Sequence, residues 1–378
     1  MKRIVIVAII LVVAFGIYKF YSGRDLGDDG RLTRAIGEYN CPTVSNLPDF
    51  GKLYDGPLID THMHIPHPPE GPEFLDSLPY SSPHPQLGRS ITVSDYICNF
   101  KTTGITKAFI FFPVFRGLED LHLAVADASV KRYPEFLVPF IMPPENDNDP
   151  SGFPTVSVDV LGEMLQVYSG LFRGYGEIGL YARGDNRGPT GAPELPPDSE
   201  RLREIYPMIR ENNLLVYFHL GRGQQESYER VLSANPDINF IFHGDQLIPY
   251  DRGVQNLNII DGILSRHKNV YYGIDELYGD VWLLHPDKSK DQFFKHFENY
   301  EELLEYDIAT WKGFIERHPD QVLWGTDRGV GNIWSMDRDV GLTLTRYARA
   351  FIALLEPSVQ DRFAHLNAEA LLLKSSNK

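Results

Sequence analysis

The chain has 378 residues, of which 43% are hydrophobic and 23% charged, a composition typical of a globular protein with a large core. Its formal net charge of −15, with no cluster of basic residues, argues against nucleic acid as a partner, because a phosphate backbone requires a basic surface. Its two cysteines, Cys41 and Cys98, lack the spacing of a metal site and permit at most one disulfide.

The N-terminal segment, residues 1–22, differs from the rest of the chain. Lys2 and Arg3 precede an apolar run over residues 4–18, a length between that of a signal-peptide core and that of a membrane-spanning helix. No small-residue cleavage site follows the run, and the aromatic residues and lysine of 18–21 resemble an interfacial belt. The sequence therefore predicts an uncleaved anchor with the folded part outside the cytoplasm, on the periplasmic side if the cell is bacterial. A cleaved signal peptide, giving a secreted protein, is the alternative.

After this anchor, which would contact the membrane through residues 4–21, we expect a tether over 23–50 and a folded domain over 51–378. In the domain, short apolar runs alternate with amphipathic stretches of helical period. The runs cover residues 57–64, 105–114, 136–143, 172–181, 214–221, 238–245, 269–276 and 321–329. Apolar strands that alternate with helices indicate a parallel sheet covered on both faces. Eight such units predict an α/β fold, a (β/α)8 TIM-like barrel preceded by an N-terminal apolar anchor helix.

Three inserted loops follow the first, fourth and seventh predicted strands, over residues 65–91, 182–198 and 278–300. Each loop begins at the C-terminal end of a strand, where barrel enzymes build their active sites, so we expect these loops to wall a pocket. The sequence contains no GxGxxG after the first strand and no GxxxxGK[ST], which removes the main support for a dinucleotide or P-loop site.

Polar side chains stand at the ends of several predicted strands. In the stretch "PLIDTHMHIPHPP", His62 and His64 point to the same side of a strand, together with Asp60. The candidates at the ends of later strands are Glu177, His219, His243 and Asp327. Each of them alone has an ordinary structural explanation, such as a hydrogen-bonded histidine or an aspartate that caps a helix. Four histidines and two carboxylates on one rim cannot all be satisfied by hydrogen bonds to one another. Zinc and similar divalent ions bind imidazole and carboxylate groups.

The set resembles the amidohydrolase superfamily of metal-dependent barrel hydrolases. That family carries HxH on strand one, Glu or a carboxylated Lys on strand four, His on strands five and six, and Asp on strand eight. The phrases "LIDTHMHI", "ERVLSANPDINFIFHGD", "VLWGTDRG" and "RFAHLNAEALL" resemble its amidohydrolase-related branch over about residues 56 to 373. The chain departs from the family where "HGDQL" replaces the glycine-rich turn after the sixth strand.

The resemblance implies one or two divalent metal ions, with Zn²⁺ expected, and a small-molecule substrate. His62, His64 and Asp327 would hold a first ion, and Glu177 would bridge to a second ion held by His219 and His243. Asp327 would also act as the catalytic proton acceptor for the attacking water. With one ion, His219 would join the first site and His243 would become a catalytic proton shuttle or a polarising group. Asp60 would orient the site without binding metal.

Substrate contacts are expected from residues just past the strand ends. The candidates are Arg116, Tyr181 and Arg222, followed by Arg183 and Arg328. An arginine at this position suits a carboxylate or a phosphate group on the substrate, although solvation or an ion pair with a nearby acid is the favoured explanation for any single one of them.

Three functions remain open from the sequence. The first is a metal-dependent hydrolase of an amide, ester, lactone or phosphoester. The second is a decarboxylase that uses one metal ion, a lyase activity also found in the amidohydrolase-related branch. The third is a membrane-tethered barrel that binds metal without catalysis, and an oligomer is compatible with each of them.

Overall fold

The structure, a computed structural model, describes most of the chain from residue 31 onward. The described residues are 31–41, 48–65, 91–114, 119–143, 155–182, 193–248, 257–275, 277–279, 288–329 and 333–376. The predicted anchor over 1–22 and most of the predicted loop over 65–91 lie outside these ranges. Among the described helices, none is long and apolar enough to cross a bilayer.

Eight parallel strands form the centre of the molecule, and each strand pairs with the next one along the chain. They are β1 Leu58–His64, β2 Ile105–Pro113, β3 Leu137–Met142, β4 Gly174–Gly179, β5 Leu215–His219, β6 Phe240–His243, β7 Val270–Ile274 and β8 Val322–Trp324. A parallel bridge between Met63 and Arg328, just past β8, brings the end of the sheet back to β1. The predicted (β/α)8 barrel is therefore confirmed, with a sheet that is nearly closed.

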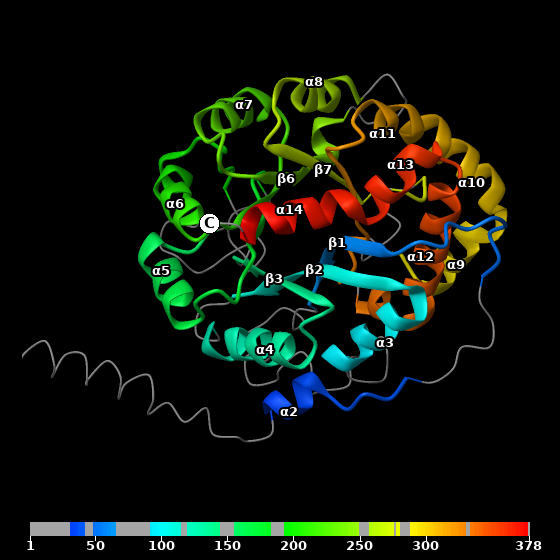
Figure 1. Ribbon diagram of the computed structural model, residues 1–378, viewed down its shortest axis with the longest axis horizontal. Helices are drawn as coiled ribbons and strands as arrows, with labels where there is room; N and C mark the ends of the chain where they lie inside the picture. The colour runs from blue at the N-terminus through cyan, green and yellow to red at the C-terminus, as the bar shows by residue number, and fades with distance from the viewer. Residues whose placement is uncertain are drawn as a thin grey trace, which may run out of the picture.

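Helices follow the strands along the chain and surround the barrel (Figure 1). They are α2 Arg31–Ile36, α3 Val93–Thr103, α4 Glu119–Arg132, α5 Val158–Val167, α6 Glu200–Glu211, α7 Gln225–Ala234, α8 Asn258–Arg266, α9 Lys290–His296, α10 Tyr300–Asp307, α11 Gly313–Arg317, α12 Arg338–Ile352, α13 Pro357–Asp361 and α14 Asn367–Ser376. Local sequence explains where several of them begin. Thr92 and Asp95 form a capping box at the start of α3, and the Ser199 hydroxyl accepts a hydrogen bond from the first turn of α6.

Helix α14 covers the end of the barrel at which the strands begin (Figure 1). Its Ala368 and Leu371 are buried in one apolar cluster with side chains from inside the barrel. The strand residues of that cluster include Ile59, Phe109, Val138, Leu215, Ile241, Tyr271 and Leu323. The Asn367 side chain donates to the carbonyls of Pro319 and Val322, which fixes the start of the helix. Because this end is filled with apolar side chains, the polar residues of the barrel interior gather at the other end.

Part of the segment predicted as a tether packs on the barrel. Helix α2 lies beside α3 and α4, and its Ala35 and Ile36 are buried. A disulfide joins Cys41 to Cys98 of α3, across 57 residues of sequence. Closing a loop of this size restricts the unfolded chain and typically stabilises a fold by about 2–4 kcal/mol. Residues 31–41 are thus held to the barrel both by apolar packing and by a covalent bond.

The last part of the insertion after β7 packs against the loop that follows β8. Lys290, at the start of α9, forms an ion pair with Asp337, with 2.5 Å between Nζ and Oδ2. The indole nitrogen of Trp334 donates to the carbonyl of Lys288 at 3.0 Å. The described ends of the two loops therefore contact each other beside the barrel.

The buried carboxylate of Asp307, at the end of α10, holds the segment that follows β7. Its Oδ2 accepts hydrogen bonds from the Tyr278 backbone N–H at 2.7 Å and from the Tyr347 hydroxyl at 2.8 Å. Its Oδ1 accepts the Gly279 backbone N–H at 3.0 Å. Asp307, Tyr278 and Tyr347 are all buried, so water cannot readily replace the carboxylate as a partner of the Tyr278 N–H and the Tyr347 hydroxyl.

We therefore expect Asp307→Ala to lower the free energy of unfolding by roughly 3–5 kcal/mol, because two buried donors and one partly buried donor lose their acceptor. Urea denaturation of the purified protein measures this change. Glu305→Ala is the matched control, since Glu305 lies exposed on the same helix and its loss should change the stability by less than about 0.5 kcal/mol. Equal denaturation midpoints for the two variants would contradict the role of Asp307.

Candidate functional site

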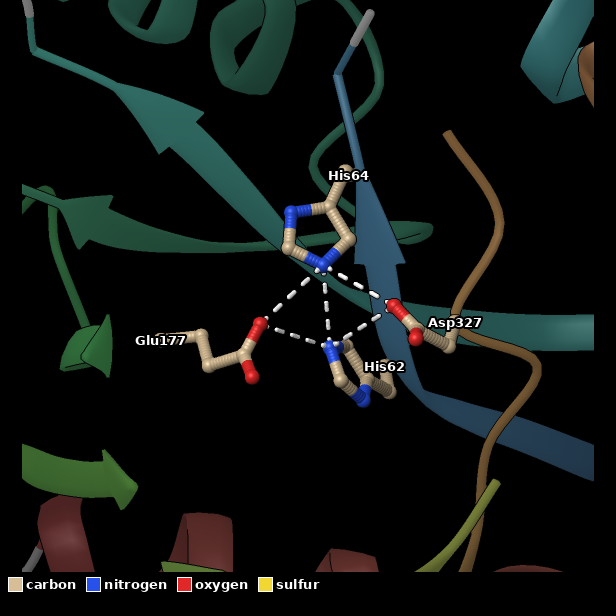
Figure 2. A group of neighbouring side chains, drawn as sticks. All are labelled: His62, His64, Glu177 and Asp327. Atoms are coloured by element: carbon tan, nitrogen blue, oxygen red, sulfur yellow. Dashed lines mark hydrogen bonds and ion pairs between the residues drawn. The ribbon is translucent and has the colours of Figure 1, made fainter. Parts of the chain in front are cut away.

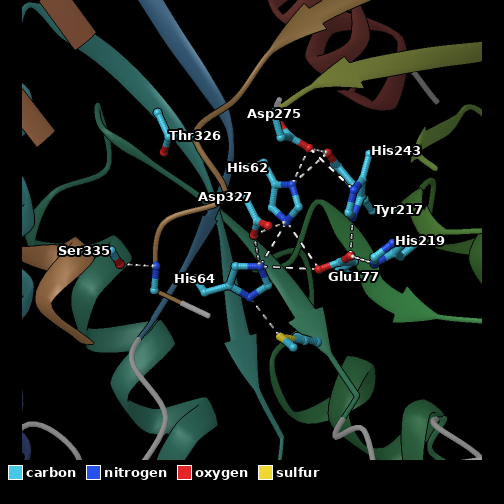
Figure 3. A network of polar contacts seen from close by, with 12 residues as sticks. His62, His64, Glu177, Tyr217, His219, His243, Asp275, Thr326, Asp327 and Ser335 are labelled. Atoms are coloured by element: carbon cyan, nitrogen blue, oxygen red, sulfur yellow. Dashed lines mark hydrogen bonds and ion pairs between the residues drawn. The ribbon is translucent and has the colours of Figure 1, made fainter. Parts of the chain in front are cut away.

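The six polar residues singled out at the strand ends lie together at one end of the barrel (Figure 3). β1 carries His62 and His64, and Glu177 lies on β4. β5 and β6 end in His219 and His243, and Asp327 follows β8. Barrel closure brings these side chains together although they span more than 260 residues of sequence.

Four ligand-type atoms from four of these residues converge on one point (Figure 2). The Nε2 atoms of His62 and His64 are 2.9 Å apart. Glu177 Oε2 lies 3.3 Å and 3.4 Å from these two nitrogens, and Asp327 Oδ1 lies 3.3 Å and 3.2 Å from them. Ligands placed tetrahedrally about 2.0–2.1 Å from a zinc ion are separated by about 3.4 Å. The spacing of this first cluster therefore fits a small divalent cation.

The other oxygen of Glu177 belongs to a second cluster with His219 and His243. Glu177 Oε1 lies 3.3 Å from His219 Nδ1 and in close contact with His243 Nε2. The imidazole rings of His219 and His243 are 4.0 Å apart between centroids. One carboxylate thus presents one oxygen to each cluster, which is the arrangement of a bridging ligand.

A glycine next to Glu177 allows β4 to present this side chain. Gly176 has φ of +129°, a region that residues with a side chain rarely adopt. A Cβ at Gly176 would lie 2.3 Å from the carbonyl oxygen of Tyr217 on β5. The register between β4 and β5 shifts between Tyr175 and Ile178, on either side of this position. The local irregularity of β4 therefore depends on glycine and re-aims the following carboxylate.

Asp60 ties β1 to the loop that carries Asp327. Its Oδ1 accepts hydrogen bonds from the backbone N–H groups of His62 and Thr326, each at 3.1 Å. Its Oδ2 accepts the Thr326 hydroxyl at 2.7 Å, and the Asp327 backbone N–H donates to the His62 carbonyl at 2.9 Å. Complete burial raises the pKa of Asp60 to about 6, although the Thr326 hydrogen bond opposes the shift. These contacts give Asp60 an orienting position.

The backbone of Asp327 has φ of +49°, in the left-handed region that aspartate adopts more readily than most residues. Its Oδ1 is buried and accepts no hydrogen bond from the described part of the chain, although two imidazole nitrogens lie within 3.3 Å. Both nitrogens and this oxygen face the space between the four side chains (Figure 2). A cation in that space would satisfy the oxygen and both nitrogens.

The charges of the site also favour a bound cation. Burial by itself disfavours a charged His62, but the carboxylates of Asp275, Asp327 and Glu177 outweigh it and hold the pKa of this imidazole well above its usual range. Burial likewise opposes ionisation of Glu177, yet His243 and His62 hold its pKa well below normal. The three carboxylates together therefore require positive charge, which protons on the imidazoles or divalent ions would supply.

Three contributors to the site were missed by the sequence analysis. Asp275 Oδ2 lies 2.7 Å from His62 Nδ1, and the Tyr217 hydroxyl lies 3.1 Å from the same nitrogen. The thioether of Met142 lies 3.3 Å from His64 Nδ1. Asp275 stands at the end of the predicted strand "NVYYGIDE", so the rule that selected the other strand-end residues applies to it equally. Tyr217 and Met142 carry no comparable signal, because they read as ordinary strand residues.

The predicted substrate contacts have different outcomes. The ring of Tyr181 lies against the imidazole of His219, with 4.5 Å between centroids, so this residue borders the second cluster. Arg222 is exposed, three residues beyond His219. Arg116 and Arg183 lie outside the described residues.

Arg328 does not lie exposed at the rim, where a substrate contact was considered. It is buried, its Nε donates to the Ser335 carbonyl at 2.8 Å, and its Nη1 donates to Asn99 Oδ1 at 3.3 Å. The guanidinium therefore connects the loop after β8 to α3. A side chain committed to these buried contacts is not available to a substrate.

Comparisons with known proteins agree with this fold. A family model described as Amidohydrolase matches residues 59–373. A search of curated proteins finds no match to this chain.

One similar solved structure is an amidohydrolase from Burkholderia multivorans with bound zinc. It is 11% identical to this chain, with a TM-score of 0.52, and the match covers 84% of this chain and 99% of that one. A probable 2-pyrone-4,6-dicarboxylic acid hydrolase from Acinetobacter baumannii with bound citric acid is 12% identical, with a TM-score of 0.50, covering 83% and 98% of the two chains. An uncharacterised TIM-barrel protein from Bordetella bronchiseptica is 18% identical, with a TM-score of 0.50, covering 84% and 99%. At these identities the likeness concerns the fold.

The close approach of Gly325 to the site yields a prediction. A Cβ at this position would lie 2.1 Å from Asp275 Oδ1 and 2.8 Å from His62 Cβ. We expect Gly325→Ala to displace these two side chains, to destabilise the protein by roughly 1–3 kcal/mol, and to reduce any divalent metal that the chain retains after dialysis. Thermal unfolding and metal analysis measure the two effects.

Gly313→Ala is the matched control, because a Cβ on that helical residue would meet Arg317 Nη1 at an ordinary 3.5 Å. This change should leave the metal content unchanged and raise the stability slightly, since alanine favours a helix over glycine. If Gly325→Ala keeps both its stability and its metal content at the control's level, the packing described around His62 is wrong.

Proposed function

Because this chain belongs to the Amidohydrolase family, we propose that it is a metal-dependent hydrolase that acts on a small molecule. The reacting centre would be the carbonyl or phosphoryl group of an amide, ester, lactone or phosphoester. The observation that carries this proposal is the convergence of His62, His64, Glu177 and Asp327, whose ligand atoms have the spacing of a tetrahedral metal shell.

The ligand assignment follows from the two clusters. His62, His64 and Asp327 would hold the first ion, His219 and His243 the second, and Glu177 would bind both ions through its two oxygens. We propose zinc as the metal, because imidazole and carboxylate suit it and the similar Burkholderia structure contains it. When bound, such ions polarise a carbonyl or phosphoryl oxygen and lower the pKa of water.

We propose that Asp327 is the carboxylate that moves a proton during the reaction. Its side chain is 38% exposed, whereas those of Glu177 and Asp275 are 11% and 3% exposed. Burial opposes ionisation of Asp327, but His62 and His64 outweigh it and lower the pKa of this carboxyl, so the group is a base at neutral pH. Asp327 would accept a proton from the attacking water and deliver it to the leaving group. Tyr181, beside His219, would contact the substrate.

The second cluster favours a hydrolase with two ions over a decarboxylase with one. In a site with one ion, His243 would be free to shuttle protons, but here its Nε2 contacts Glu177 Oε1 closely. We expect metal analysis of the purified chain to give close to two zinc ions per chain, and a chelator to abolish hydrolysis until zinc is restored. A stoichiometry of one, with carbon dioxide as a product, would favour the decarboxylase.

We also propose that the barrel works outside the cytoplasm, held to the membrane by residues 4–21. The disulfide between Cys41 and Cys98 supports this location, because disulfides persist in oxidising compartments and are rare in the cytosol. Fractionation of cells that make the full chain, compared with cells that make a chain without residues 1–22, tests the anchor. Recovery of the full chain in the soluble fraction would favour the alternative of cleavage and secretion.

The proposed role of Asp327 predicts the result of one substitution. Asp327→Asn should lower kcat/KM by roughly 10²–10⁴-fold, because the amide cannot accept the proton. The assay would be the substrate found by screening amides, esters, lactones and phosphoesters with the zinc-loaded chain. Asp159→Asn, an exposed change on α5, should leave the rate unchanged. Full activity of Asp327→Asn would remove this residue from the mechanism.

A further inference from the structure

A histidine that binds a metal through one ring nitrogen has a second nitrogen that also needs a partner. Such second partners fix the ring and its tautomer, and a carboxylate does so more strongly than a weak acceptor. In the first cluster, the two histidines differ in this respect. His62 Nδ1 lies 2.7 Å from the Asp275 carboxylate, whereas His64 Nδ1 lies 3.3 Å from the thioether of Met142.

Asp275 lies behind the His62 ring, on the opposite side from Glu177 and Asp327 (Figure 3). Its side chain is buried, and its Oδ2 accepts a hydrogen bond from the Tyr217 hydroxyl at 3.3 Å. The same oxygen lies 4.0 Å from Nδ1 of His243, a member of the second cluster. Asp275 therefore faces the rear of one histidine from each cluster and is shielded from any substrate at the mouth of the barrel.

The geometry at Asp275 is that of a hydrogen bond to an imidazole. The separation of 2.7 Å between Asp275 Oδ2 and His62 Nδ1 is normal for a charge-assisted hydrogen bond. His62 also directs its Nε2 toward the first cluster, so Nδ1 is the nitrogen that must carry the proton when metal binds. The carboxylate is the acceptor for that proton.

We infer that Asp275 is a positioning residue, whose carboxylate accepts the Nδ1–H of His62 and holds the ring in the tautomer that offers the Nε2 lone pair to the metal. This inference rests on the proposed metal-dependent function. It makes His62 the preorganised ligand of the first cluster and His64 the weakly supported one. Gly325 contributes to the same arrangement, because the absence of a side chain there leaves space for the Asp275 carboxylate.

The test compares zinc affinities of the full chain by competition with a chromophoric chelator. Asp275→Asn keeps the shape of the side chain but removes its charge, and it should weaken zinc binding about 10–100-fold. Tyr217→Phe, which leaves the carboxylate in place, should weaken binding by less than about threefold. Asp159→Asn, on the surface of α5, should bind zinc like the wild type. Equal losses for Asp275→Asn and Tyr217→Phe would assign the effect to packing and overturn the inference.

A spectroscopic measurement on the wild type keeps the inference testable if Asp275→Asn does not fold. In the zinc-loaded chain, ¹H–¹⁵N NMR should show a downfield Nδ1–H signal from His62, assigned by its loss in His62→Asn. A His62 ring protonated on Nε2 would overturn the inference. If the wild type binds no zinc at all, the proposed function fails and the inference fails with it. If the wild type binds zinc and Asp275→Asn binds it equally well, the inference alone fails.

Discussion

Closure of the parallel sheet is the constraint on which the rest of this molecule depends. Parallel strands in a barrel all end on the same rim, so residues at the ends of β1, β4, β5 and β6 must meet those that follow β7 and β8. The contact that completes the closure runs through the site, since Met63 pairs with Arg328 and Asp60 binds the backbone and hydroxyl of Thr326. The same backbone contacts that close the barrel therefore place Asp327 beside His62 and His64.

One end of the barrel contributes mainly to stability, and the other end carries the residues proposed for chemistry. At one end, α14 covers an apolar cluster, which contributes the free energy of burial. At the other end, carboxylates and imidazoles lie so close together that water cannot screen their charges. Burying these charged groups costs free energy, which a bound cation would offset. Two close backbone approaches, at Gly176 and Gly325, let these polar side chains pack so tightly. The polar site at one end is thus supported by the apolar cluster at the other end.

Glu177 and Asp275 each connect the two clusters, but from opposite sides. Glu177 presents one carboxylate oxygen to each cluster at the front, where ligand atoms converge. Asp275 lies at the back, bonded to His62 and 4.0 Å from His243. In the proposed enzyme the front carboxylate would join the ions, and the rear one would keep the imidazoles oriented. Asp327 is the most exposed of the three carboxylates and would carry the proton that moves during the reaction.

The sequence by itself determined the class of fold and most of the rim, because both depend on local patterns: buried runs of strand length, helical periods between them, and polar residues where the runs stop. It identified His62, His64, Glu177, His219, His243 and Asp327 for this reason. Only the tertiary structure decided which atoms face one another: that Asp275 supports His62, that Arg328 turns inward to hold Ser335, and that Cys41 reaches Cys98. These contacts join residues far apart in the chain, and their geometry depends on how the barrel closes and on the direction of each side chain, which no local pattern of residues specifies.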